Sequence, residues 1–491
     1  MASENAAAAA PHFLLLPIMA QGHLIPMADF AKLLAEQGVK VTLVTTPQNA
    51  PRFQSLLSKP ALQIQIQTIS FPPENGIQCE NFDSLPSLEL GAKFFADTSL
   101  LRGPTEELFQ RLSPRPSCLV SDMALPWTGG IARKFNVPRL VFYSLSCFYL
   151  RVITTLRTTT DVVYKIMAAA DLEPVTIPDL PDPVQITKAK LIFSLDPIFM
   201  DWSAQMAKAD HESYGFVLNS FQDLEPKYLS EFKKVTGSKK VWCVGPVSLC
   251  NKDTMDKTHR GDKSAIGERE CLEWLDKQDP SSVIYAALGS TCNVATSQMI
   301  ELGLALQASN RPFIWVIRQT NATQGLEKWL SEHNFEDKAN GRGLVVRGWA
   351  PQVLILSHPA IGAFVTHCGW NSTIEAIATG VPMVAWPLFA DQMFNEMLIV
   401  QILKIGASVG VEKCYAWGAE EEIGVQVKKE AVIDAIEKVM DGEDKEGMRR
   451  RVREFAERAK AATEDGGSSH LNVKLLIKDI MDQGHSGPNK I

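Results

Sequence analysis

The sequence lacks any apolar run long enough to cross a membrane. The longest candidate, residues 376–390, is interrupted by Gly380, Pro382 and Pro387, whereas a spanning helix needs about 20 predominantly apolar residues. The first residues, MASENAAAAAP, have neither the basic start nor the apolar centre of a secretion signal. We therefore expect a cytoplasmic protein with no membrane as its partner.

Paired cysteines, a dinucleotide fingerprint and metal-binding acidic clusters are also missing. The nine cysteines are scattered, and none forms a Cys-x-x-Cys pair, which favours reduced thiols in the core and offers no zinc site. No Gly-x-Gly-x-x-Gly motif follows a predicted strand, so a nicotinamide cofactor is not expected. The acidic stretch from Asp441 to Asp444 is typical of a turn between helices. We expect neither a metal nor a cofactor.

A basic patch is absent too. The net charge is −7, and no long cluster of Lys and Arg occurs, which argues against a nucleic acid as the partner. With 45% apolar and 21% charged residues, the composition is that of a globular protein. A chain of 491 residues exceeds one ordinary core, so two or three domains are expected.

The sequence does contain two series of short apolar strands that alternate with helices. The first series opens with strands over residues 13–17 and 39–45, joined by a helix over about 24–37. The second includes strands over residues 283–288 and 313–317. Such βαβ units imply parallel sheets with a site beyond the strand ends. The fold class predicted is α/β, with two doubly wound, Rossmann-like domains facing each other across a cleft.

The predicted domain boundaries follow from the composition of the chain between these series. Residues 246–267 are polar and mixed in charge, as expected of a linker. The domains are accordingly placed at residues 1–245 and 268–465, and residues 466–491 form a C-terminal helix with a frayed tail. Residues 147–202 have a less regular apolar pattern, with prolines at 174, 178, 181 and 183, and suit either a lid over a pocket or a long loop packed on the core.

The segment from Trp349 to Gln392 carries the densest set of candidate binding residues. A strand over residues 361–366 breaks at His367 and restarts as a helix near Asn371. A helix start has free backbone N–H groups and a positive dipole end, which together hold phosphate. Glu375 provides a carboxylate that can accept two hydrogen bonds from a ribose diol, and Ser372 and Asn371 provide hydroxyl and amide donors. Trp349 provides a flat ring for a base.

Three strand ends in the first half carry polar side chains. His23, Asp122 and Ser144 each follow an apolar strand, and because the ends of parallel strands share one edge of a sheet, these side chains are expected to converge. In the second half, Ser290 lies in a Gly-Ser-Thr turn directly after a strand and is a further candidate phosphate contact.

The segment from Trp349 to Gln392 resembles the signature box of plant family 1 UDP-glycosyltransferases, which begins with Trp, ends with Gln and has the same length of 44 residues. The resemblance implies two domains of the GT-B type, the first binding the acceptor and the second UDP-glucose, with the C-terminal helix crossing back. It puts Trp349, with Ala350 and Gln352, on uracil, Glu375 on the ribose, and His367, Asn371 and Ser372 on the phosphates. Trp370, Asp391 and Gln392 would contact the sugar, and Ser144 matches a position that touches it.

Sugar transfer needs a nucleophilic acceptor oxygen, and a neutral imidazole is a suitable base for it. His23 lies at a helix start, where the dipole is expected to keep the ring neutral. Asp122 is expected to accept the other ring N–H and to stabilise the imidazolium as it forms. The resemblance assigns the same roles to this pair. Direct displacement would invert the anomeric centre and give a β-O-glucoside.

The acceptor expected is a small lipophilic molecule with a hydroxyl, such as a flavonoid, terpenoid, steroid or phenol of plant secondary metabolism, and the protein is expected to act as a monomer. Aromatic residues expected near its pocket are Phe94, Phe95, Phe148, Tyr149, Phe199 and Trp202.

Simpler interpretations of the site residues stay open at this point. Each one alone also fits a core aromatic, a buried histidine, a helix cap or a solvated charge. Alternative functions are a non-catalytic UDP-sugar sensor of the same fold and another sugar-nucleotide enzyme.

Overall fold

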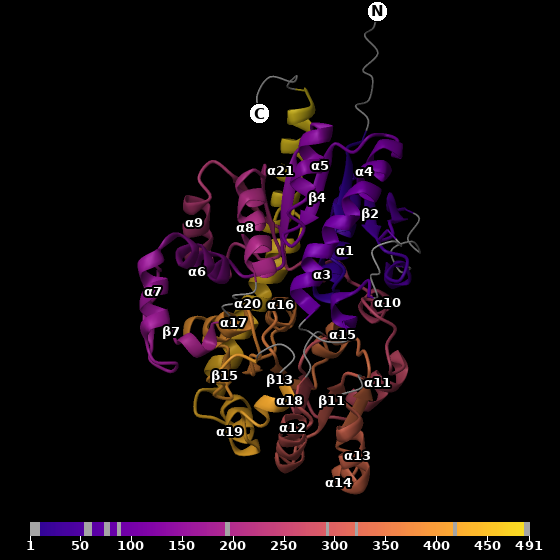
Figure 1. Ribbon diagram of the computed structural model, residues 1–491. Coiled ribbons are helices and arrows are strands. Elements are labelled where there is room, and N and C mark those ends of the chain that lie inside the picture. Colours follow the sequence, from indigo (N-terminus) through magenta and orange to yellow (C-terminus); the bar gives the residue numbers. More distant parts are fainter. Residues whose placement is uncertain are drawn as a thin grey trace, which may run out of the picture.

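The computed structural model of the protein describes residues 10–53, 61–72, 79–85, 90–191, 197–290, 294–319, 323–415 and 420–485 (Figure 1). Residues 1–9 and 486–491 lie outside the described residues, and the second of these ranges includes most of the tail predicted to be frayed, residues 484–491. The chain forms two α/β halves stacked one above the other, each built around its own parallel sheet (Figure 1).

The first sheet has seven parallel strands in the order β3-β2-β1-β4-β5-β8-β9. Strands β1 and β4 are buried along their whole length, as continuous apolar runs are when helices cover both faces of a parallel sheet. The strand order reverses between β1 and β4, which is where an open α/β sheet forms its ligand crevice. The bounds are β1 (His12–Leu16), β2 (Lys40–Thr45), β3 (Ile64–Thr68), β4 (Cys118–Asp122), β5 (Arg139–Tyr143), β8 (Gly215–Leu218) and β9 (Lys240–Cys243).

The second sheet has six parallel strands in the order β12-β11-β10-β13-β14-β15. Its order reverses between β10 and β13, the strands that lead into Ser290 and His367. The two sheets are separate, so the prediction of two doubly wound domains is confirmed. The bounds are β10 (Val283–Ala287), β11 (Phe313–Ile317), β12 (Gly343–Arg347), β13 (Ile361–Thr366), β14 (Met383–Ala385) and β15 (Gly406–Ser408).

The helices of the first half lie around its sheet, and α1 begins three residues before its predicted start at about residue 24. Helix α1 begins at Gln21 because the N–H of Gln21 donates to the carboxylate of Asp83, 3.2 Å away, a partner distant in sequence. The helices are α1 (Gln21–Glu36), α3 (Gly91–Asp97), α4 (Arg102–Arg111), α5 (Thr128–Phe135), α6 (Cys147–Thr158), α7 (Thr160–Ala168), α8 (Pro197–His211) and α9 (Pro226–Val235).

The interpretation of residues 147–202 as an irregular segment is wrong. About half of it forms α6, α7 and the start of α8, and the proline-containing stretch after α7 forms a two-stranded antiparallel hairpin, β6 (Val175–Ile177) with β7 (Val184–Ile186). Helix α6 has a Ser146 cap, whose hydroxyl accepts from the N–H of Tyr149, 3.0 Å away.

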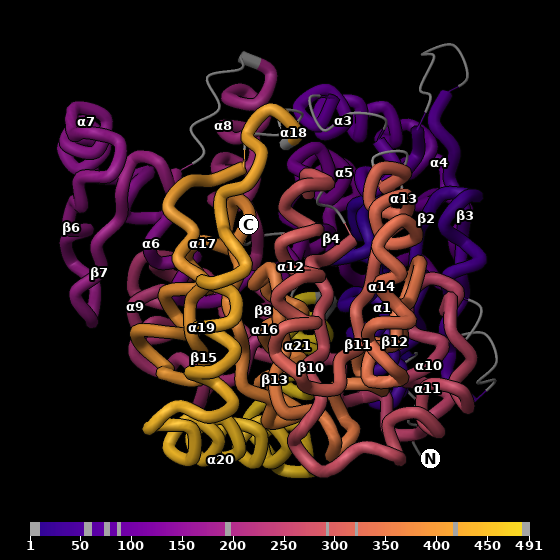
Figure 2. The backbone as a smooth tube through the Cα atoms, turned by 90° about the horizontal axis from the view of Figure 1, so that it is seen from below, coloured from indigo at the N-terminus to yellow at the C-terminus, as the bar shows by residue number. Residues whose placement is uncertain are grey.

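Helices of the second half surround the second sheet, and α12 packs against α19 (Figure 2). The last helix, α21, leaves this half and runs up along β9 of the first sheet (Figure 1). The helices are α10 (Thr254–Thr258) in the connection, then α11 (Glu268–Leu275), α12 (Thr296–Ala308), α13 (Gln324–Glu332), α14 (Phe335–Ala339), α15 (Gln352–Leu356), α16 (Trp370–Thr379), α17 (Gln392–Met397), α18 (Glu420–Ile423), α19 (Lys429–Met440), α20 (Lys445–Thr463) and α21 (Ser468–His485).

Eight of the nine cysteines lie among the described residues, and all eight are free thiols, six of them buried. In the part of the chain that the structure describes, no helix has the length and apolar character needed to cross a membrane.

Candidate active site

Asp122 is the last residue of β4, and His23 lies in the first turn of α1, which follows the adjacent strand β1. The Nδ1 atom of His23 is 2.8 Å from Oδ2 of Asp122, whose other oxygen accepts the N–H of Ala124 at 2.9 Å. The Asp122 side chain is 1% exposed and that of His23 is 32% exposed. Because a carboxylate only accepts, the proton sits on Nδ1 and Nε2 is left to act as a base.

The charge of the His23 ring follows from its neighbours rather than from the helix dipole. Burial lowers the pKa of His23, but the carboxylates of Asp122, Asp391 and Asp83 outweigh burial, so the pKa lies above its ordinary value. The expectation that the position at a helix start keeps the ring neutral is therefore wrong in direction. The raised pKa makes His23 a stronger base.

His367 lies at the end of β13, wedged between two glycines. A Cβ atom on Gly369 would come 2.4 Å from Nε2 of His367, and one on Gly289 would come 2.6 Å from the same atom. Only residues without a side chain permit this approach. Burial lowers the pKa of His367 to about 4, so the ring is neutral near pH 7, and its buried Nδ1 has no hydrogen-bond partner among the described residues.

Glu375 and Gln352 are held together on the helices α16 and α15. The amide of Gln352 donates to Oε2 of Glu375 at 2.8 Å and lies 3.1 Å from the hydroxyl of Ser372. Glu375 is 3% exposed. The three side chains therefore form one polar cluster beside the first turn of α16, at the site predicted to hold ribose and phosphate.

Asn371 joins the second half of the molecule to the first. Its Oδ1 atom accepts from the hydroxyl of Ser144 at 2.5 Å and from the amide of Asn219 at 3.3 Å, and its amide donates to the carbonyl of Gly22. The helix start of α16 thus lies against the turn that carries His23. The hydroxyl of Ser144 and the amide of Asn371 are engaged with each other in this structure.

Trp370 is buried at the junction between the halves. It is 2% exposed, and its indole N–H donates to the carbonyl of Asn219 at 2.7 Å. The indole N–H is therefore committed to this junction, and the group that Trp370 can offer a sugar is its backbone N–H in the first turn of α16.

Asp391 and Gln392 begin helix α17 at the edge of the cleft. The Oε1 atom of Gln392 accepts the N–H groups of Leu388 and Phe389 at 3.0 and 3.1 Å, so its amide nitrogen is the group left for a ligand. Asp391 accepts from Asn395 at 2.8 Å, and burial raises the pKa of Asp391 to about 6.

Trp349, Ala350 and Ser290 also face the same cleft. The indole Nε1 of Trp349 is buried without a hydrogen-bond partner among the described residues, and Ala350 is 5% exposed. Ser290 follows Gly289, whose φ of +86° is favourable for glycine. Thr291, the third residue of this turn, lies outside the described residues.

One cavity of about 1430 Å³ is lined by His23 and by the site residues of the second half, and it continues into an apolar region of the first half. It exceeds the 300–1,000 Å³ usual for a single small ligand, which leaves room for two molecules. Of the six aromatic residues predicted near an acceptor, four line it, namely Phe95, Tyr149, Phe199 and Trp202. The remaining two, Phe94 and Phe148, are core residues that pack on Phe82 and Tyr228.

The chain resembles known proteins over nearly its whole length. Residues 247–446 match the family model described as UDP-glucoronosyl and UDP-glucosyl transferase. UDP-glycosyltransferase 73C6 of Arabidopsis thaliana is 48% identical over 97% of this chain and 97% of that protein. The chain belongs to the UDP-glycosyltransferase family.

Solved structures place the enzyme in the same group. The crystal structure of UGT73P12 from Glycyrrhiza uralensis, complexed with glycyrrhetinic acid 3-O-monoglucuronide, is 34% identical and covers 97% of each chain with a TM-score of 0.88. Phytolacca americana UGT2, complexed with UDP-2fluoro-glucose and pterostilbene, is 26% identical over 96% of this chain and 100% of that chain, with a TM-score of 0.73. This glycosyltransferase therefore has the GT-B fold, with a UDP-sugar and a small molecule as the ligands that fit its family.

The sequence did not identify two charged residues of the glycosyltransferase as part of its site. Arg260 and Asp262 belong to the stretch interpreted as a plain linker, yet both line the cleft. Asp262 accepts from Arg52 at 2.6 Å, and Arg260 reaches Glu375 at 2.6 Å. No local signal marks them, because a polar stretch of mixed charge has the same composition whether it is solvated or folded into a site.

Proposed function

We propose that the enzyme transfers glucose from UDP-glucose to a hydroxyl of a small lipophilic acceptor and inverts the anomeric centre, giving a β-O-glucoside. The observation that carries this proposal is the pairing of His23 with Asp122, with Nδ1 and Oδ2 2.8 Å apart. His23 lines the same cavity as Asn371, Ser372 and Glu375 of α16. From this position His23 can take the proton of an acceptor hydroxyl while the hydroxyl oxygen attacks the anomeric carbon.

The donor half of the proposal rests on the groups around α16. Backbone N–H groups of its first turn, with the hydroxyls of Ser372 and Ser290 and the neutral ring of His367, are assigned to the diphosphate. Glu375 is assigned to the ribose diol and Trp349 to uracil. The donors assigned to the diphosphate should stabilise the leaving group without a metal ion. We therefore expect the transfer rate to persist in the presence of a chelator such as EDTA.

The assignment of glucose rests on Gln392. Its oxygen is occupied by two backbone N–H groups, which fixes the amide nitrogen as a donor toward a sugar hydroxyl. An epimer places one hydroxyl elsewhere and loses such a contact. Initial rates with UDP-glucose should therefore exceed those with UDP-galactose, and equal rates would contradict the assignment.

The acceptor assignment rests on the apolar wall of the cavity. The rings of Phe95 and Trp202 stack with centroids 4.3 Å apart, and Phe199 lies beside them, 5.4 Å from Trp202. Such a wall favours a flat or polycyclic apolar molecule over an anionic one. The relative crystallised with pterostilbene binds a flat, neutral molecule of this kind. The ligand of another relative, glycyrrhetinic acid 3-O-monoglucuronide, has a polycyclic apolar core that also carries carboxylates.

The proposal is tested by replacing the base. His23→Ala should lower turnover of an aliphatic alcohol by about 10² to 10⁴-fold while the Kd for UDP, measured by calorimetry, changes little. An acidic phenol, which needs less help to lose its proton, should be affected less. A well-folded His23→Ala variant that glucosylates an aliphatic alcohol at the wild-type rate would show that His23 is not the base.

A further inference from the structure

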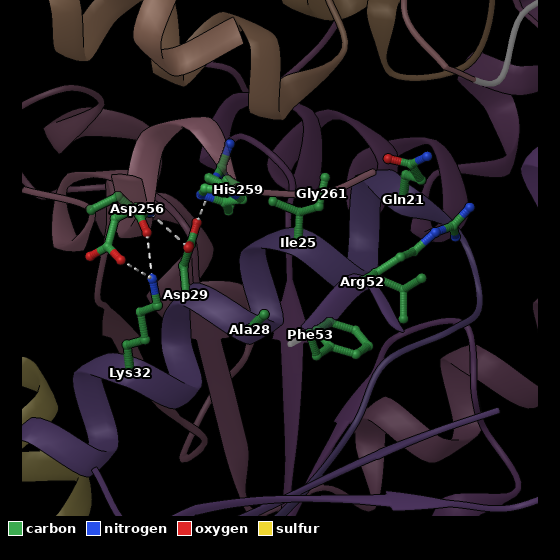
Figure 3. Close-up of a pocket in the computed structure, with 13 residues that line it drawn as sticks. Gln21, Ile25, Ala28, Asp29, Lys32, Arg52, Phe53, Asp256, His259 and Gly261 are labelled. Atoms are coloured by element: carbon green, nitrogen blue, oxygen red, sulfur yellow. Dashed lines mark hydrogen bonds and ion pairs between the residues drawn. The ribbon is translucent and has the colours of Figure 1, made fainter. Parts of the chain in front are cut away.

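The connection between the two halves folds into the donor side of the cleft. Residues 254–265 lie between α1 of the first half and the strand end that carries Trp349. Ser264 forms a parallel β-bridge with Trp349, and the N–H of Ala265 donates to the Trp349 carbonyl at 2.8 Å. Figure 3 shows His259 and Gly261 of this connection above Ile25 and Asp29 of α1. The connection is therefore a packed part of the site.

Arg260 lies between two buried carboxylates that belong to different halves. Its Nε atom is 2.7 Å from Oδ2 of Asp29 on α1, and Nη1 is 2.6 Å from Oε1 of Glu375 on α16. The side chains of Arg260, Asp29 and Glu375 are 10%, 3% and 3% exposed. Burial lowers the pKa of Arg260, but Asp29 and Glu375 outweigh it and raise the pKa above its ordinary value, so the guanidinium is a permanent cation.

Glu375 can bind a ribose while it keeps Arg260. A carboxylate has about four lone-pair positions, two on each oxygen. Arg260 occupies one position on Oε1, and Gln352 occupies one on Oε2. One position on each oxygen is left, which matches the two hydroxyls of a ribose diol. Removing the cation would leave a buried, unpaired charge, which is strongly unfavourable; the nucleotide is therefore expected to bind beside Arg260 rather than displace it.

Gly261 supports the neighbouring ring. Its φ is +96°, and a Cβ atom there would come 2.6 Å from Cζ2 of Trp349 and 2.9 Å from Cδ1 of Ile25. The backbone of Gly261 thus packs directly on the indole and fixes its position relative to α1. Trp349 and Glu375, the residues assigned to the base and the ribose, are thus held by two consecutive residues of the connection, Gly261 and Arg260.

We propose that Arg260 is a positioning residue of the nucleotide site, which orients Glu375 for the ribose diol while Gly261 holds Trp349 for the base. The inference rests on the proposed assignment of Glu375 to the ribose. It gives the connection a role in donor recognition and couples that role to the first half of the molecule through Asp29.

The test compares the Kd of UDP with that of 2′-deoxy-UDP by calorimetry, which requires no acceptor and no turnover. Wild-type enzyme should prefer UDP by about tenfold or more, as expected for a hydrogen bond to a charged group. Arg260→Met should weaken UDP binding about 10 to 100-fold and bring the preference close to one, and Arg260→Lys should recover part of it. Arg311→Met removes an arginine paired with Asp441 away from the cleft and should change neither value.

Two further variants make the result decisive. Arg260→Met leaves two buried carboxylates without their cation. The double variant Arg260→Met/Asp29→Asn removes one of those charges, and it replaces the single variant in the binding measurement if the single variant does not fold. In a Glu375→Gln background, Arg260→Met should have no further effect on the preference. A folded Arg260 variant that keeps the wild-type preference overturns the positioning role alone. If the wild type shows no preference for UDP over 2′-deoxy-UDP, or if Glu375→Gln keeps the wild-type preference, Glu375 does not bind the ribose. The inference about Arg260 then falls with that assignment.

Discussion

At the scale of single residues, the reactivity of this glycosyltransferase depends on how Asp122 changes the basicity of His23. The neutral imidazole is the form that accepts a proton, and its fraction increases as the pH rises through the pKa. Since the carboxylates around His23 raise this pKa above its ordinary value, the active form is reached at a higher pH than for a free histidine.

The pH profile should report this coupling. For an aliphatic acceptor, kcat/KM of the wild type should fall as the pH falls through an apparent pKa above about 6.5. Asp122→Asn removes the largest stabilising charge, so the pKa of His23 should decrease and the acidic limb should move to lower pH. The maximal rate should fall by about 10²-fold, because the imidazolium that forms has lost its partner.

The carboxyl group of Asp391 titrates in the same pH range as His23, and its contribution to the pH profile can be separated. Burial raises the pKa of Asp391 to about 6, and Asp391 also acts on His23. Neighbouring groups of this kind titrate as a pair. Asp391→Asn should leave a single acidic limb. If Asp122→Asn shifted the limb to higher pH, the role assigned to Asp122 would be contradicted.

At the scale of elements, the C-terminal helix α21 ties the end of the chain to the first half. The hydroxyl of Ser469 donates to the carbonyl of Gly245 at 2.6 Å, and the amide of Asn472 donates to that of Cys243 at 2.9 Å. The buried side of the helix joins the core of the first half through Val473, Leu476, Ile477 and Ile480. The chain therefore returns with α21 to a core that begins at Phe13, 460 residues before Val473.

Two neighbouring leucines on α21 give a matched test of this contribution. Leu476 is 0% exposed and Leu475 is 53% exposed. Leu476→Ala should lower the free energy of unfolding by about 2–5 kcal/mol, whereas Leu475→Ala should change it by less than about 0.5 kcal/mol. Urea unfolding followed by circular dichroism measures both. Equal effects of the two substitutions would mean that α21 does not pack on the first half as described.

At the scale of the whole molecule, the two halves divide the work of recognition. The apolar wall of Phe95, Phe199 and Trp202 comes from the first half, and the groups assigned to the nucleotide come mainly from the second, with Arg260 between them. The halves meet through Asn371, which contacts Ser144, Asn219 and Gly22. Acceptor and donor binding should therefore be separable by substitution, although they share one cavity.

Phe199→Ala tests this separation. The ring lies on α8, is partly exposed, and lines the cavity, so its removal should cost little stability. Loss of its apolar contact should raise the KM for an apolar acceptor about tenfold, while the Kd for UDP stays as in the wild type. A change in UDP affinity of the same size as the change in acceptor KM would contradict the division between the halves.

The sequence alone was sufficient wherever the deciding information is local. Fully buried strands appear as continuous apolar runs, so β11 and β13 were predicted at their observed bounds. The helix start at α16, with Gly369 before it and Glu375 one turn on, has its meaning within a few residues. The pairing of His23 with Asp122 could also be expected, because parallel strand ends meet at one edge of a sheet.

Tertiary structure decided whatever depends on partners distant in the chain. The start of α1 is set by Asp83, and the pKa of His23 is set by carboxylates from three separate segments. Arg260 is the clearest case. Its residue type and neighbours are those of a solvated linker, and it becomes part of the site only because folding brings Asp29 and Glu375, 231 and 115 residues away, to either side of it. Composition and periodicity contain no information on such contacts, because they describe only neighbours along the chain.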